Sequence, residues 1–244
     1  MDQPSSEAPN ATPSQASSRV VAILEAGRSL QDNEAYEAAL ERYSEALDLD
    51  QEFAPTHVAL ASIHLELGRV QEAIDELERA AEINPEMGLV WAQLGQLYYD
   101  QDQGDLAVRA LEKAQALEPD EGSIAYFLGL AYSFRSFQDI QQSVLALERA
   151  SELEPDRAEI WYNLATAYVR RDDGDDGYLA IQALERSLAI DGENAMAYYY
   201  LGQLYMQAED SARAVVAWRT FVETTDDAEA AAMVRTWIEG LDAQ

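Results

Sequence analysis

The stretch from Gly88 to Glu121 reads GLVWAQLGQLYYDQDQGDLAVRALEKAQALEPDE and is 34 residues long. Its apolar and small residues fall into two blocks, each with the spacing of one helix face. These residues are Trp91, Leu94, Gly95 and Tyr98 in the first block and Ala107, Leu111 and Ala114 in the second. We place Gly104 in the turn between the blocks, and Pro119 ends the unit because proline cannot continue a helix interior. The stretch therefore predicts two helices joined by a turn.

The same pattern recurs along the chain in six units, and we number positions from the first residue of each. The units span residues 20–53, 54–87, 88–121, 122–157, 158–194 and 195–227. Position 8, in the first helix, is always small: Gly27, Ala61, Gly95, Gly129, Ala165 and Gly202. The facing position in the second helix is also small: Ala39, Ala73, Ala107, Ser143, Ala180 and Ala214. Small residues at both places allow the two helices of a hairpin to approach closely.

The combination of Trp, Leu-Gly, Tyr, a small residue and Pro at fixed positions resembles the tetratricopeptide repeat family, whose period is 34 residues. The resemblance covers Val20 to about Ala228. It implies an all-α fold, a right-handed superhelical solenoid of six helix-turn-helix repeats. The fourth unit carries two extra residues and the fifth three, and Gln51, Gly192 and Asp226 replace the closing proline in three units.

The two ends of the chain differ from the repeats. Residues 1–19 are rich in Ser, Pro, Ala and Gln, and we predict a disordered tail there. Residues 228–244 contain one apolar helical face, which predicts a helix that caps the solenoid. That face consists of Ala230, Met233, Val234, Trp237, Ile238 and Leu241. The large side chains Trp218 and Phe221 of the sixth unit are expected to pack against this cap.

The charge of the chain restricts its partners. It carries 46 acidic and 16 basic residues, for a net charge of −30. Such a surface repels nucleic acid and anionic lipid, so we predict no nucleic-acid partner. The acidity indicates either a basic partner or a solvated surface that keeps the chain soluble. The acids are spread along the whole chain, which favours the second interpretation.

Targeting and redox signals are absent from the sequence. There is no cysteine, which excludes disulfides and thiolate metal sites. The N-terminus lacks the basic start and apolar run of a secretory signal, and no apolar stretch reaches membrane-spanning length. We therefore predict a cytoplasmic protein without membrane insertion.

No residue pattern indicates catalysis. His57 and His64 stand where other units have Trp or Tyr, so we interpret them as packing residues. The acidic loop 170–177 lacks EF-hand spacing, which favours a solvated turn over a calcium site. The acid pairs predicted to be solvated helix faces are Glu72 with Glu76 and Glu148 with Glu152. We expect no enzyme activity, no cofactor and no metal.

The resemblance also implies a binding face, because first helices of this family line a concave groove that holds peptides or partner helices. In the last three units this face is nearly neutral and aromatic, and position 5 is tyrosine three times running. These tyrosines either contact a partner or fill space against the neighbouring repeat. The family's clamp of Lys, Asn and Arg for chaperone tails is absent, since Leu24, Ala59 and Gln93 stand at its places. The candidate groove residues are Tyr126, Leu130, Phe134, Tyr162, Thr166, Arg170, Tyr199, Gln203 and Met206.

The sequence thus favours a non-enzymatic protein–protein interaction module, an adaptor or assembly scaffold that binds a peptide or partner helix in its groove. The alternative is a structural protein that self-assembles through its convex face or its ends, and weak self-association is compatible with both.

Overall fold

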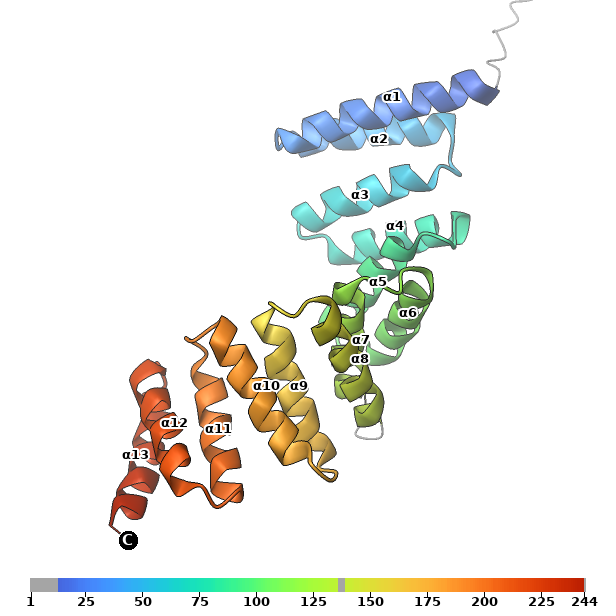
Figure 1. Cartoon of the computed structure of the whole chain (residues 1–244). Helices are drawn as coiled ribbons and strands as arrows, with labels where there is room; N and C mark the ends of the chain where they lie inside the picture. Colours follow the sequence, from blue (N-terminus) through green and yellow to red (C-terminus); the bar gives the residue numbers. More distant parts are fainter. Residues whose placement is uncertain (1–12, 136–138, 244) are drawn as a thin grey trace, which may run out of the picture. The chain divides into compact units, whose positions relative to one another are not determined.

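The computed structural model describes residues 13–135 and 139–243, which form thirteen α-helices and no strand (Figure 1). The predicted all-α architecture is confirmed. The helices are α1 (Pro13–Asp32), α2 (Tyr36–Leu49), α3 (Ala54–Glu66), α4 (Val70–Ile83), α5 (Gly88–Asp100), α6 (Gly104–Leu117), α7 (Gly122–Arg135), α8 (Ile140–Leu153), α9 (Ala158–Arg171), α10 (Asp176–Ile190), α11 (Ala195–Gln207), α12 (Ser211–Thr224) and α13 (Ala228–Asp242).

The first helix begins earlier than the sequence indicated. Residues 13–19 were assigned to a disordered tail, but α1 starts at Pro13 and continues through Val20. Proline is favourable at the first helical position, because its fixed φ suits the helix and its missing N–H would have no partner there. The rest of the predicted tail lies outside the described residues.

The chain divides into two compact units, Met1–Leu97 and Tyr98–Gln244, which we call unit 1 and unit 2. In unit 1, α1 packs on α2 and α3 on α4. In unit 2, α7 packs on α8, α9 on α10 and α11 on α12, and each pair contacts the next along the chain (Figure 1). Apolar residues of successive pairs form one core in unit 2, including Leu147, Leu164 and Leu184.

The small residues at position 8 allow the hairpins to close. A Cβ atom added at Gly27 would lie 2.2 Å from ring carbon Cε1 of Tyr43. A Cβ atom added at Gly202 would lie 2.2 Å from Nε1 of Trp218. Real Cβ atoms do not approach other atoms so closely, so the large ring on the second helix requires glycine on the first. The facing residue Ala214 is fully buried, which confirms the predicted close approach.

The turns inside the hairpins share one backbone geometry at position 15. This residue has a positive φ in five units: Glu34 59°, Gly68 71°, Asp102 59°, Asp172 49° and Glu209 60°. The next N–H donates to the carbonyl five residues earlier in four of these turns: Ala35 to Leu30 at 2.9 Å, Arg69 to His64 at 2.7 Å, Gln103 to Tyr98 at 2.8 Å and Asp210 to Tyr205 at 2.8 Å. This is the Schellman arrangement that ends a helix. Gly104, which we predicted in the turn, is instead the first residue of α6, because Asp102 already supplies the left-handed position.

The side chain at position 4 links the first helix of a repeat to the loop that precedes it. The side chain at this position hydrogen-bonds the carbonyl six residues earlier in four units. The donor and acceptor pairs are His57 Nε2 with Gln51 at 3.1 Å, Trp91 Nε1 with Pro85 at 3.0 Å, Trp161 Nε1 with Pro155 at 2.9 Å and Tyr198 Oη with Gly192 at 3.3 Å. The bond gives a hydrogen-bond partner to a loop carbonyl that accepts no hydrogen bond within a helix.

Tyrosines at position 11 form hydrogen bonds between neighbouring repeats of unit 2. Each tyrosine hydroxyl there donates to a glutamate twenty residues earlier, on the second helix of the preceding repeat. The pairs are Tyr132 with Glu112 at 2.6 Å, Tyr168 with Glu148 at 2.7 Å and Tyr205 with Glu185 at 2.6 Å. Burial, together with Glu185, raises the pKa of Tyr205 to about 12. The prediction that Glu148 belongs to a purely solvated face is therefore wrong.

The C-terminal helix α13 covers the last repeat as predicted. The Asp227 side chain accepts hydrogen bonds from the N–H groups of Glu229 and Ala230, which caps its first turn. Val234 is fully buried, and the ring of Trp237 lies 5.3 Å from that of Trp218. Met233 is 44% exposed, so its assignment to the buried face is wrong. It lies one residue, or about 100° of helix rotation, from the buried Val234.

The left-handed turn predicts an unusual effect of glycine. Glu34→Gly should raise the free energy of unfolding by about 0.5–1 kcal/mol, because Gly adopts positive φ without the steric cost of a Cβ atom. The matched control is Glu41→Gly, an exposed glutamate in the interior of α2. It should lower the free energy of unfolding by about 0.5–1 kcal/mol. Urea unfolding followed by circular dichroism measures both, and equal destabilisation would contradict the turn geometry.

His57 is placed to bind a second proton. Its Nδ1 lies 2.6 Å from the Glu76 carboxylate and its Nε2 faces the Gln51 carbonyl, so both ring nitrogens have acceptors. The hydrogen bond to Glu76 raises the pKa of His57 above 6.5, although burial of the ring opposes this. We had predicted that Glu76 belongs to a solvated helix face. That prediction is wrong, because Glu76 is the hydrogen-bond partner of His57.

This geometry predicts a pH dependence of stability. Because the pKa is raised in the folded state, the contribution of His57 is fully present below pH 6.5 and is lost as pH rises through the folded value. The free energy of unfolding should therefore fall over that interval, and His57→Gln should abolish the fall. His64→Gln is the control and should retain it. Urea unfolding at a series of pH values gives the comparison.

Candidate protein-binding face

The first helices α7, α9 and α11 of unit 2 carry all nine residues predicted to line a groove. We call the surface formed by these side chains, with Trp237 of α13, the first-helix face. Tyr126 is buried there and Leu130, Tyr162, Thr166, Tyr199, Gln203 and Met206 are half-buried. Phe134 and Arg170 are exposed. The face therefore combines packed and accessible side chains.

Tyr126 belongs to the packing between repeats. Only 8% of it is exposed, and the guanidinium carbon of Arg157 lies 4.3 Å from its ring centre. Its hydroxyl accepts a hydrogen bond of 3.2 Å from Nδ2 of Asn163 on α9. For Tyr126 the structure therefore favours the second of the two alternatives, filling of space between repeats, because Arg157 and Asn163 cover it.

The other two tyrosines of position 5 surround Tyr200, which we did not predict. The Tyr200 ring lies 6.2 Å from that of Tyr162 and 5.7 Å from that of Tyr199. Tyr199 also contacts Trp237 at 6.2 Å, and its hydroxyl accepts a hydrogen bond of 3.1 Å from Gln203. Tyr162 and Tyr199 thus lie in an aromatic cluster that retains partial exposure.

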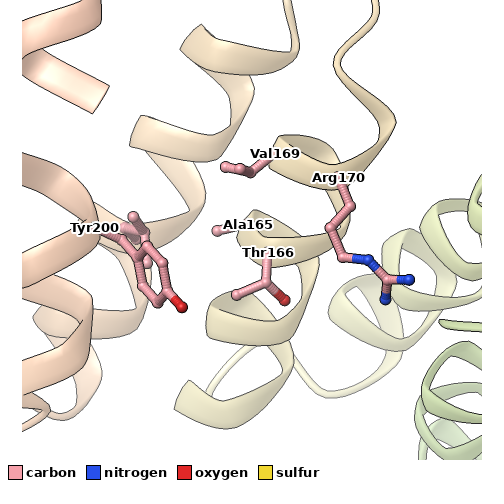
Figure 2. A pocket seen from close by; sticks show the side chains of 6 residues that line it. Ala165, Thr166, Val169, Arg170 and Tyr200 are labelled. Atoms are coloured by element: carbon pink, nitrogen blue, oxygen red, sulfur yellow. The ribbon is translucent and has the colours of Figure 1, made fainter. Parts of the chain in front are cut away.

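A pocket of about 130 Å³ lies beside Tyr200. It is lined by Ala165, Thr166, Val169, Arg170, Leu184 and Tyr200. Thr166 and Arg170 were predicted, and the structure brings them together with Tyr200 from another repeat (Figure 2). Helical spacing could have indicated Tyr200, since it lies three residues before Gln203 and so on the same side of α11.

Arg170 extends from the rim of this pocket. Figure 2 shows its side chain directed away from Tyr200. Its Nη1 donates to the Ser133 carbonyl at 2.9 Å and also to the Ser133 hydroxyl, both on α7. Within the described part of the chain, no carboxylate forms an ion pair with Arg170. An exposed cation therefore adjoins an apolar pocket.

Two further apolar areas flank the pocket. On α7, Phe134 is 52% exposed and its ring lies 6.1 Å from that of Tyr99. On the other side, a shallow hollow is lined by Gln203, Met206, Gln207, Trp218 and Trp237. Gln203 and Met206 were among the predicted groove residues, whereas Trp218 of α12 and Trp237 of α13 were not.

The acidic loop after α9 has a structural role. Arg171 binds Asp176 through two hydrogen bonds of 2.8 and 2.5 Å, and Asp176 is only 2% exposed. The Asp173 N–H also donates to this carboxylate at 2.9 Å. The bonds to Arg171 lower the pKa of Asp176, although burial opposes the shift. We had predicted a solvated turn here. The loop is only partly solvated, because the buried carboxylate of Asp176 fixes the start of α10.

Two further observations concern metal ions and the lipid bilayer. No group of three or more His, Asp or Glu side chains among residues 13–135 and 139–243 is placed to hold a metal ion. No described helix has both the length and the hydrophobicity needed to cross a bilayer.

Comparison with protein families and solved structures gave a consistent result. Models described as tetratricopeptide repeat match residues 30–86 and 65–130, and residues 128–177 and 179–218. PilF of Pseudomonas aeruginosa is 18% identical, with a TM-score of 0.70, over 91% of this chain and 98% of its own.

Two further solved structures are similar. YrrB, described as a tetratricopeptide repeat protein with an unusual peptide-binding site, is 20% identical over 72% of this chain and 89% of its own, with a TM-score of 0.65. MamA is 22% identical over 71% of this chain and 92% of its own, also at 0.65. No match was found among curated proteins. At these identities the solved structures show the fold alone.

The two kinds of tyrosine at position 5 should respond differently to truncation. Tyr126→Ala should lower the free energy of unfolding by about 3–5 kcal/mol, because it opens a cavity under Arg157 and Asn163. Tyr162→Ala should lower it by only about 1–2 kcal/mol, because part of its ring already faces water. Denaturant unfolding of both variants checks this, and equal losses would contradict the burial difference.

Proposed function

Because this chain belongs to the tetratricopeptide repeat family, we propose that it is a non-enzymatic adaptor or assembly scaffold that binds a peptide or helix of a partner protein. Repeats of this kind present extended surfaces to other proteins. We place the binding site on the first-helix face of unit 2.

The observation that carries this proposal is the pocket beside Tyr200, on an aromatic face that is almost free of acidic residues. The chain has 46 acids, yet none of the nine residues predicted to line the groove is acidic. Glu159, in the first turn of α9, lies 3.7 Å from Arg157, which also pairs with Glu154 at 3.1 Å. Exposed or half-exposed aromatic and methionine side chains with little charge are typical of protein-binding surfaces.

A solved structure of similar fold also supports a peptide-binding function. A peptide-binding site is described for YrrB, whose helices follow the same architecture. Two titratable side chains of unit 2 with a shifted pKa, Tyr168 and Asp176, have partners outside the pocket. Tyr168 is bonded to Glu148 and Asp176 to Arg171, so neither side chain is directed into the pocket.

Self-assembly is the second candidate function, and one observation favours it. Leu145 on α8 is 55% exposed and Val216 on α12 is 66% exposed, at corresponding places in the second helices of two repeats. Light scattering over a range of concentrations distinguishes the two, because self-assembly predicts particles that grow with concentration.

The direct test is selection of binders from a displayed library of random peptides on the full chain. Peptides that bind should lose at least about tenfold in affinity on Thr166→Trp, because the indole would occupy the pocket. The matched control is Thr224→Trp at the exposed end of α12, which should leave affinity unchanged. Circular dichroism verifies that both variants fold. Peptides bound equally by wild type and Thr166→Trp would place the site elsewhere and contradict the proposal.

A further inference from the structure

We infer that the segment bound on the first-helix face carries a single internal acidic side chain that pairs with Arg170, between apolar side chains that contact the Tyr200 pocket and Phe134. This inference rests on the proposed function and specifies the chemistry of the partner: an uncharged, apolar stretch of another protein with one aspartate or glutamate within it.

Arg170 differs from several other arginines of unit 2 in its ion pairing. Arg149, Arg171 and Arg186 of the same unit each form an ion pair with a carboxylate of this chain. Arg170 has no such partner in the described residues, and its side chain is exposed. The bonds to Ser133 hold its guanidinium in a fixed orientation, and a guanidinium offers five donors, so others remain for a ligand. A carboxylate is the group that this planar fork binds best.

The position of Arg170 on the face also limits the partner. Apolar surface lies on both sides of it, with Phe134 and Tyr99 toward α7 and the pocket of Val169 and Tyr200 toward α11. A segment that contacts both areas must pass Arg170 and continue. Its acidic group is therefore a side chain within the segment and not a terminal carboxylate.

The spacing of the segment follows from the helices. Packed helices lie about 8–10 Å apart, and an extended chain advances about 3.3 Å per residue. The apolar side chains are therefore expected about three residues before and after the acidic one.

The overall charge limits the number of acids in the segment. A net charge of −30 repels a run of carboxylates, whereas one carboxylate gains a close contact with Arg170. The partner is accordingly not an acidic tail. Nor is it a basic peptide, because the first-helix face presents one cation, Arg170, and none of its side chains is acidic.

The test uses two displayed random-peptide libraries and the full chain. In the first library both peptide ends are fused, so no terminal carboxylate is free, and in the second the C-terminus is free. The fused library should yield binders enriched in one acidic residue, with apolar residues about three positions away on each side. Enrichment from the free-end library alone would show recognition of a terminal carboxylate and overturn the inference.

A double-mutant cycle then tests the contact itself. For a selected peptide with glutamate, Arg170→Gln should weaken binding about tenfold or more. For the same peptide with glutamine at that place, Arg170→Gln should change affinity less than twofold. Arg109→Gln is the matched control, an exposed arginine of α6 that does not line the pocket, and it should not distinguish the two peptides.

The outcomes separate this inference from the proposed function. Peptides whose binding is lost on Thr166→Trp but is unaffected by Arg170→Gln would overturn the acidic partner and leave the binding face in place. Peptides insensitive to both substitutions, or libraries that yield no binder, would overturn both. Circular dichroism of Arg170→Gln shows whether loss of the Ser133 contact has altered the fold.

Discussion

The close approach of the two helices within each hairpin is the constraint on which the rest of the structure depends. At Gly27 and Gly202 a ring from the second helix occupies the space where a Cβ atom would lie. A Cβ atom there would force the ring or the helix to move and would open the core, and protein interiors tolerate little empty volume. The left-handed residue at position 15 then reverses the chain within two or three residues.

Polar contacts between repeats use the acidic residues that make the composition unusual. Glu148 and Glu185 accept hydrogen bonds from tyrosines of the next repeat, and Asp176 is bound by Arg171 inside a hairpin. Exposed ion pairs such as Arg149 with Asp120 contribute little individually, because water screens them. A few of the 46 acids thus take part in the stacking of the repeats.

The first-helix face results from unequal packing of one repeat position. Tyr126 is covered by Arg157, at the end of its own repeat, and by Asn163 of the following repeat, whereas Tyr162 and Tyr199 contact the ring of Tyr200 and stay partly open. The space left between α9 and α11 is the pocket that we propose as the centre of binding. Arg170 adds the one charge that gives this otherwise apolar face a preference for an acidic group.

The sequence alone determined the helical hairpins, the small contact positions and the capping helix, because these follow from local periodicity and from a pattern that recurs in every unit. Tertiary structure decided which side chains of one helix face are covered. Tyr126 and Tyr162 occupy the same repeat position, so the periodic pattern cannot distinguish them. Nor does it indicate Tyr200, which lines the pocket because residues of α9 lie beside this residue of α11. Burial depends on residues that are distant in the sequence, such as Arg157, which lies over Tyr126 from 31 positions away, and Asn163 of the next repeat. No local pattern contains that information.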